Sequence, residues 1–464
     1  MTDAPHVGVL PLYIALYDEV RPEARPEMQA FADRVADTLE GAGLRVERAP
    51  IACVRHEVEA AIRELMRREV ELLATLHLAY SPSMEAIDAL CEAHVPLLLL
   101  DTTPSERFGA DATAADMFRN HGIHGVQDLA CMLRRHERPY LLAVGHVDDP
   151  AFLADVVSAA RAAQATRALR TMRVLVLGDP FPGMGDFTVT EDVMRARLGI
   201  ESHWATIDAL AQAAAQVPEE EVAAEGAADA ERFDLSHVSD EVLARTNRVG
   251  LGVRRMIDEA KAGAFSLNFA SFTGESGVGT VPFLEASKAM ARGIGYGGEA
   301  DALTAGLVGA LGRAGCRVTF TEMFCPDWTE GTVFMSHMGE CNLAIACGDT
   351  KLVEKQYAFS TVGNPAVAIP KLEPGTATLV NLAPAPHDSF DLIAARVEVL
   401  DRGPVPGFPD VPHFWLRPVD RDLRGFLQRY SELGGTHHVA LCMGDEVALA
   451  ARLAQMLGIG FAVV

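Results

Sequence analysis

The strongest constraint on the fold is an alternation of strand-like and helix-like segments over the first 170 residues. Short apolar runs typical of strands occupy residues 7–16, 44–51, 70–78, 95–101 and 140–147. Segments with helical periodicity separate them, at residues 22–43, 56–68, 84–93, 126–136 and 152–168. Strands joined by such helices pair in parallel, because a parallel crossover needs about a dozen residues or more. We therefore predict a Rossmann-like or flavodoxin-like α/β domain.

A second α/β segment follows, and the C-terminal part changes character. The second segment has predicted strands at 174–177 and 265–269, and predicted helices at 189–198, 281–292 and from about 301. Beyond about residue 316, short strands dominate, at 317–324, 332–335, 343–346, 366–369, 377–382 and 392–400, which favours a barrel or sandwich. The tail returns to α/β texture, with helices at 423–433 and 445–457 and strands at 439–443 and 460–464. A chain of 464 residues exceeds the usual size of one core. We predict domains at residues 1–170, 171–315 and 316–464.

Several classes of protein are disfavoured by charge and composition. A net charge of -24 argues against nucleic acid or an anionic membrane as partner, because both attract a positive face. The first strand is not followed by a G-x-G-x-x-G sequence, so a dinucleotide site is not predicted. The N-terminus lacks the pattern of a signal peptide, and the apolar runs are too short to span a bilayer. Eight scattered cysteines without a C-x-x-C pair indicate free thiols in a reducing compartment. A cytoplasmic protein is expected.

Side chains that can bind a metal gather beside turns in four places of the C-terminal half. These places are residues 297–301, 320–323, 336–340 and 434–438. Glu322 interrupts an apolar strand, where a lone buried carboxylate would be costly. Two carboxylates together with imidazoles suit Mn²⁺, Co²⁺, Fe²⁺ or Mg²⁺ better than structural zinc. The four segments together indicate a site for a divalent cation.

Each of these residues also has a purely structural interpretation. Glu299 and Asp301 could sit at the start of a helix, where a negative charge or a side-chain cap is favourable. His337, between apolar neighbours, could be a hydrogen-bonded core histidine, and the pair His437 and His438 could belong to a surface loop. The sequence also does not decide whether the glycine-rich segment 274–279 moves as a lid. The metal-site hypothesis depends on the joint occurrence of the four segments.

The same segments carry a resemblance to the family of L-arabinose and L-fucose isomerases. Residues 298–305 resemble the Gly-Glu-Gly-Asp-Trp-Lys-Thr-Ala segment of L-arabinose isomerases. Phe320-Thr321-Glu322 resembles their Phe-Met-Glu, and residues 336–340 resemble Ser-His-Met-Leu-Glu. Residues 434–438 are similar to part of Ala-Gly-Gly-Ala-His-His, residues 120–125 to Asn-Gln-Ser-Ala-His-Gly, and Gly178-Asp179 with Thr190-Glu191 to Gly-Asp and Thr-Glu. The matches keep the family's order over residues 118 to 440.

The resemblance implies two α/β domains followed by a C-terminal domain with a β-barrel. It also implies the residues of the site. Glu299, Glu322, His337 and one of the histidine pair, with His438 favoured, would hold Mn²⁺ or another divalent cation such as Co²⁺, Mg²⁺ or Fe²⁺. His437 would then contact the substrate. His124 would reach the substrate of a neighbouring subunit, which implies a homo-oligomer, a trimer or hexamer. Asp301 would support the ligands from behind.

The activity implied is an aldose–ketose isomerisation of a monosaccharide through an enediolate. Glu299 and Glu322 would alternate as base and acid, as proton transfer between neighbouring carbons requires. The chain also departs from the family's pattern: Trp-Lys is replaced by Ala302-Leu303, and the acid after the second glutamate is Met323. These changes remove groups near the substrate, so we expect a divergent branch with a sugar other than L-arabinose. A metal-dependent epimerase and a non-catalytic sugar-binding protein are the alternatives.

Overall fold

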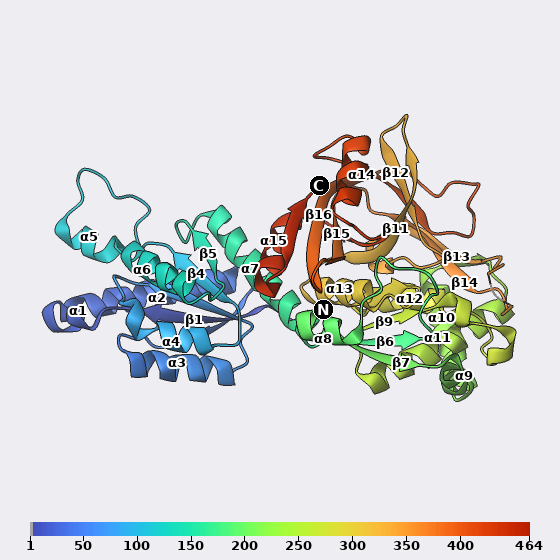
Figure 1. The fold of residues 1–464 in the computed structure, drawn as a ribbon, viewed down its shortest axis with the longest axis horizontal. Coiled ribbons are helices and arrows are strands. Elements are labelled where there is room, and N and C mark those ends of the chain that lie inside the picture. The colour runs from blue at the N-terminus through green and yellow to red at the C-terminus, as the bar shows by residue number, and fades with distance from the viewer. Residues whose placement is uncertain (1–2, 360) are drawn as a thin grey trace. The chain divides into compact units, whose positions relative to one another are not determined.

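The computed structural model describes residues 3–359 and 361–464, which form two compact units, Met1–Arg167 and Ala168–Val464 (Figure 1). The first unit holds a five-stranded parallel sheet in the order β2-β1-β3-β4-β5. Its strands are β1 (His6–Leu12), β2 (Arg45–Arg48), β3 (Leu72–His77), β4 (Leu97–Asp101) and β5 (Leu141–Val144). This is the flavodoxin-like order, so the predicted α/β domain is confirmed.

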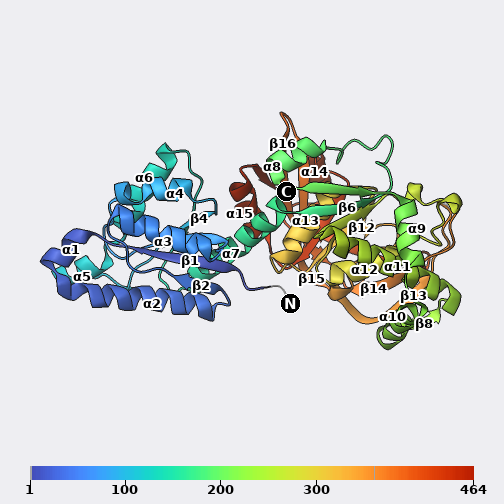
Figure 2. The same cartoon turned by 90° about the horizontal axis from the view of Figure 1, so that it is seen from below.

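Helices cover both faces of this sheet. The helices of this part of the chain are α1 (Ala15–Val20), α2 (Arg25–Gly41), α3 (Arg55–Arg67), α4 (Ile87–Glu92), α5 (Ala114–Asn120), α6 (Ile123–Arg135) and the long α7 (Pro150–Arg170). The short helices α1 and α5 have no buried residues. Figure 2 shows α3 and α4 on one face of β1 and α2 on the other. The apolar stripes of α3, α4 and α6 pack on the strands as one core, as their helical periodicity predicts.

The second unit begins with a four-stranded parallel sheet in the order β10-β9-β6-β7. Its strands are β6 (Arg173–Leu177), β7 (Glu201–Ala205), β9 (Ala264–Leu267) and β10 (Gly295–Gly298). Its helices are α8 (Glu191–Leu198), α9 (Ile207–Ala215), α10 (Glu219–Arg232), α11 (Asp240–Ala260), α12 (Phe283–Ala291) and α13 (Ala302–Arg313). In an open parallel sheet, functional groups gather at the carboxyl ends of the strands, and β10 ends directly before Glu299.

The C-terminal part of this unit contains a closed antiparallel barrel, as predicted. Its strands follow the order β15-β18-β11-β12-β17-β16, and β16 pairs back with β15. They are β11 (Val318–Asp327), β12 (Thr332–Ser336), β15 (Gly375–Ala385), β16 (Ser389–Val399), β17 (His413–Pro418) and β18 (His438–Met443). The strand β19 (Gly460–Val463) adds to β16, and α14 (Leu423–Glu432) and α15 (Val447–Leu457) lie between strands in sequence. A small sheet joins β8 (Asp234–His237), β13 (Ala346–Glu354) and β14 (Ala366–Leu372).

One predicted strand, at residues 343–346, is wrong. The segment Leu343–Ile345 forms a 3₁₀ turn, because the side chain of Asn342 accepts a hydrogen bond from the backbone N–H of Ala344. The boundaries predicted at residues 171–315 and 316–464 stay a prediction, since both segments lie within one compact unit. Among the described residues, no helix is both long and apolar enough to cross a membrane.

Candidate metal centre

The register of the barrel brings Glu322 and the segment around His337 and His438 together. Glu322 of β11 pairs with His438 of β18 on one side and with Ser336 of β12 on the other. Directly opposed residues of antiparallel strands lie close enough for their side chains to touch. His337 follows Ser336, so three of the predicted ligands lie side by side on three neighbouring strands. Glu322 lies in the middle of β11, His337 just after β12 and His438 at the start of β18.

Glu299 reaches the same place from the parallel sheet, by way of a strained turn. Glu299 and Ala300 both adopt left-handed backbone conformations, with φ of 51° and 66°, at a cost of order 1–3 kcal/mol each for such residues. Asp301 is the N-cap of α13, and its Oδ1 accepts a hydrogen bond from the N–H of Thr304 over 2.9 Å. Its other oxygen lies 2.9 Å from Nδ1 of His438. Asp301 thus caps a helix and holds a histidine at the same time.

Four side chains converge within the span of a single ion. One ligand atom from each of Glu299, Glu322, His437 and His438 lies within 4.8 Å of the others. Nε2 of His438 is 2.8 Å from Oε2 of Glu299 and 3.0 Å from Oε1 of Glu322. Metal–ligand distances of about 2.0–2.6 Å allow ligand atoms this far apart to share one cation.

His337 faces the two carboxylates with an unused nitrogen. Its Nε2 lies 3.7 Å from Oε1 of Glu299 and 3.8 Å from Oε1 of Glu322. This atom is buried and has no hydrogen-bond partner among the residues that the structure describes. A buried nitrogen without a partner is costly unless something else satisfies it. A divalent cation between the carboxylates would do so, and the donor set therefore fits a metal.

A buried carboxylate that the sequence analysis did not assign, Glu340, orients His337 from behind. Its Oε2 accepts hydrogen bonds from Nδ1 of His337 over 2.7 Å and from the N–H of Gly339 over 2.8 Å. Its Oε1 accepts one from the hydroxyl of Tyr296. In the neutral imidazole, such a contact places the proton on Nδ1 and leaves the lone pair on Nε2. In the sequence, only the three-residue spacing between His337 and Glu340 could have indicated that these two side chains are in contact.

Aromatic rings enclose the histidines. Phe187 stacks on His438 with ring centroids 4.9 Å apart and planes 9° from parallel. Phe320 packs edge-on against His337 at 4.7 Å and against His438 at 4.9 Å. These rings exclude water from one side of the cluster, which strengthens electrostatic interactions within it.

The charges of the cluster shift its pKa values in opposite directions. Burial alone would raise the pKa of the Glu299 and Glu322 carboxyls, but His337 and His438 outweigh it and lower both. Burial alone would lower the pKa of His337, but the carboxylates, led by Glu340, raise it to about 10. The pKa of His438 is likewise raised well above its usual value, against burial, by Asp301, Glu299 and Glu322. The metal-free site therefore holds protons where a cation would bind.

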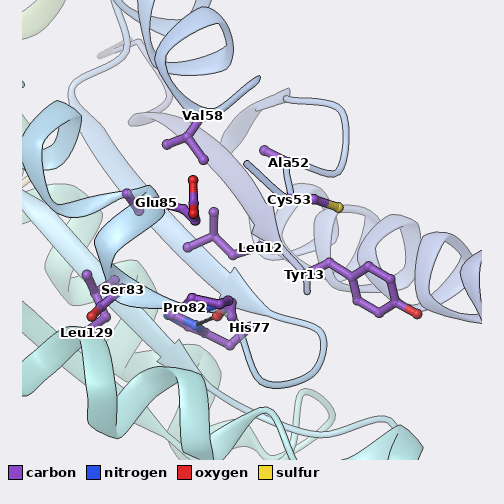
Figure 3. Close-up of a pocket in the computed structure, with 12 residues that line it drawn as sticks. Leu12, Tyr13, Ala52, Cys53, Val58, His77, Pro82, Ser83, Glu85 and Leu129 are labelled. Carbon is purple, nitrogen blue, oxygen red and sulfur yellow. Dashed lines mark hydrogen bonds between the residues drawn. The ribbon is translucent and has the colours of Figure 1, made fainter. Parts of the chain in front are cut away.

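His124 is described with the first unit, where it is exposed near the start of α6, and its ring lies 5.7 Å from that of His121. The same unit has a narrow pocket beside the ends of β1 and β3, around Leu12 and His77 (Figure 3). Its volume of about 10 Å³ has room for one water molecule.

Burial lowers the pKa of His77, which lines this pocket, to about 3, so this histidine stays neutral. The pocket is too small for a sugar.

Comparison with known proteins agrees with this geometry. Residues 174–315 match the L-arabinose isomerase central domain, and residues 317–460 match the L-arabinose isomerase C-terminal domain. The L-arabinose isomerase of Nocardioides sp. is 27% identical over 459 residues, covering 94% of this chain and 89% of that protein. The L-arabinose isomerases of Serratia proteamaculans and Aeromonas salmonicida are 25% and 24% identical, covering 95% and 92% of this chain and 90% and 87% of those proteins. The two matched domains account for more than half of the sequence, and the chain therefore belongs to the L-arabinose isomerase family of sugar isomerases.

Proposed function

We propose that this protein is a metal-dependent aldose–ketose isomerase that acts on a monosaccharide through an enediolate. The observation that carries the proposal is the convergence of two ionised carboxylates and the imidazoles of His437 and His438 within 4.8 Å, beside the unsatisfied Nε2 of His337. Glu299, Glu322, His337 and His438 are the proposed ligands of Mn²⁺ or a similar divalent cation. His437 is proposed to contact the sugar.

The two glutamates would move the protons. Isomerisation transfers a proton between the first two carbons of the sugar and another between their oxygens. One carboxylate would accept the proton from the carbon beside the carbonyl and return it to the carbonyl carbon. The other carboxylate would accept the proton of the neighbouring hydroxyl group and return it to the carbonyl oxygen, so that both end ionised as they began. A bound divalent cation would act as a Lewis acid that stabilises negative charge on the sugar oxygens.

Further expectations drawn from the family are part of the proposal. The protein is proposed to work as a homo-oligomer, a trimer or hexamer, in which His124 of one subunit reaches the substrate of another. A cytoplasmic location is proposed as well. The replacement of the family's Trp-Lys by Ala302-Leu303 and of its acid by Met323 supports a sugar other than L-arabinose.

The direct test is metal-dependent turnover on a panel of sugars. Protein stripped with EDTA is expected to be inactive on aldopentoses, aldohexoses and deoxy sugars, and added Mn²⁺ is expected to restore ketose formation on at least one of them. The products are identified by chromatography, so that a new aldose would indicate epimerisation instead. Tight Mn²⁺ binding without turnover on any sugar would contradict the proposed reaction, and absence of Mn²⁺ binding would contradict the site.

Metal binding is expected to release protons and to strengthen as pH rises. His337, with a pKa of about 10 in the metal-free site, is protonated at neutral pH and must lose its proton to bind a cation. We expect about one to two protons released per Mn²⁺ at pH 7, from His337 and His438. Calorimetry in buffers of different ionisation enthalpy measures this number. In His337→Gln it should fall by about one; an affinity that does not change between pH 6 and pH 8 would contradict the prediction.

A further inference from the structure

The two adjacent histidines of the site are held in different ways. The side chain of His438 is fully buried, whereas that of His437 is 40% exposed. Nε2 of His437 faces the metal centre, 3.6 Å from Oε1 of Glu322. Its other nitrogen, Nδ1, lies 2.6 Å from Oδ2 of Asp186, and its backbone N–H donates to the same oxygen over 2.9 Å. A single carboxylate oxygen therefore holds both the ring and the backbone of His437.

This contact decides which nitrogen of His437 carries the proton. A carboxylate oxygen only accepts hydrogen bonds, so Nδ1 is the donor. In the tautomer with this proton on Nδ1, Nε2 carries the lone pair and faces the two glutamates, as an acceptor for an O–H group. The side chain is 40% exposed, so a substrate can approach the ring.

Asp186 comes from a loop at the carboxyl end of the parallel sheet. The loop covers residues 178–190 and joins β6 to α8 (Figure 2). Glycines with positive φ, Gly178 at 93° and Gly183 at 85°, interrupt it. Phe187, the residue after Asp186, stacks on His438 and also lies 5.6 Å from the ring of His437. Asp186 and Phe187 thus fix the middle of the loop to both histidines.

We infer that Asp186 is a positioning residue, which acts through His437 to present Nε2 of that ring as a hydrogen-bond acceptor for a hydroxyl group of the bound sugar. The inference rests on the proposed isomerase function and extends it, because it assigns substrate recognition to a pair of residues outside the four proposed metal ligands. The inference implies that a change at Asp186 weakens the binding of the sugar and leaves the binding of the metal unchanged.

A double-mutant cycle tests this inference. Asp186→Ala and His437→Ala are each expected to raise KM about tenfold, since each removes one oriented hydrogen bond to substrate, while kcat and the Kd for Mn²⁺ change less than about threefold. The double variant should be no worse than His437→Ala alone, because Asp186 acts only through that ring. Asp186→Asn keeps an acceptor oxygen and should restore KM to within about threefold of the wild type. Additive losses in the double variant, or an unchanged KM in Asp186→Ala, would overturn the inference.

A second measurement does not depend on activity. Hydrogen exchange followed by mass spectrometry reports on the loop 178–190 and on the segment around the amide of His437, which donates to Asp186. Both should exchange faster in Asp186→Ala than in the wild type. Asp192→Ala serves as the matched control, because that acid is 87% exposed on α8 and pairs only with Arg195 in the structure's described contacts. Unchanged exchange in Asp186→Ala would overturn the contact itself. If exchange is faster in Asp186→Ala but the wild type turns over no sugar, the contact between Asp186 and His437 is supported and the proposed isomerase function fails. The two failures can therefore be told apart.

Discussion

Glu299→Gln and Glu322→Gln are each expected to lower kcat by about 10³-fold or more, since each removes a carboxylate that transfers protons. Both carboxyls are held ionised by the neighbouring imidazoles, which lower their pKa against the effect of burial. A glutamine keeps the shape and one oxygen, but it cannot accept a proton from carbon. Turnover of the sugar found in the panel, at saturating Mn²⁺, measures the effect.

The matched control is Glu432→Gln, the same exchange at a half-exposed carboxylate on α14, which should leave kcat unchanged. The Kd for Mn²⁺ is measured for each variant as well, because the two glutamates are proposed both as ligands and as proton carriers. A variant that binds Mn²⁺ and keeps more than about a tenth of the wild-type kcat would contradict the assigned role.

Gly298→Ala is the second change with a large expected effect. A Cβ at this position would lie 2.7 Å from Cε1 and 2.8 Å from Nε2 of His337, and 3.4 Å from Cζ of Phe320. The ring of His337 cannot simply withdraw, because Glu340 holds its Nδ1 and Phe320 packs against it. We therefore expect the ring to be displaced, the affinity for Mn²⁺ to fall about tenfold or more, and the fold to lose about 1–3 kcal/mol, as other overpacked sites do.

Gly312→Ala is the control for this substitution. Gly312 lies in α13, where an added Cβ would meet only Val318 at 3.7 Å and the carbonyl oxygen of Gly293 at 3.9 Å. The Gly312→Ala variant should bind Mn²⁺ with the affinity of the wild type. The affinity is measured by titration with the metal, and the stability by thermal unfolding in EDTA. Wild-type affinity in Gly298→Ala would mean that His337 is not a ligand.

Several elements could be predicted because burial leaves a regular pattern of apolar residues in the sequence. The apolar strands of the first unit and the long barrel strands β15 and β16 are of this kind. The strand β7 was not predicted, because it is largely exposed and its sequence, Glu-Ser-His-Trp-Ala, lacks an apolar alternation. The strand β10 reads Gly-Tyr-Gly-Gly, a composition typical of a turn. Its glycines are explained by close packing that only the folded chain reveals, since a Cβ on Gly295 would meet the backbone of α13.

Some residues of the candidate site could likewise be identified from the sequence, and others could not. Glu299, His337 and the histidine pair stood out because they lie beside turns, and Glu322 because it interrupts an apolar strand. Together their segments resemble those of a known family, and their roles stay predictions. Glu340 and Asp186 did not stand out. Asp186 contacts a residue 251 positions away in sequence, and no local pattern encodes such a distance. Hydrogen bonds that orient a functional ring depend on tertiary structure, so a single sequence seldom identifies them.

The pairing of Glu322 with His438 and Ser336 makes the metal site depend on the correct strand register of the barrel. Side chains alternate between the two faces of a strand, so a slip of β11 by one residue would turn Glu322 to the opposite side of the barrel. A misregistered molecule could keep most of its backbone hydrogen bonds and still lose the convergence of carboxylates and imidazoles. The stoichiometry of bound Mn²⁺ would then count the correctly assembled barrels in a preparation, and the cation would favour them by mass action.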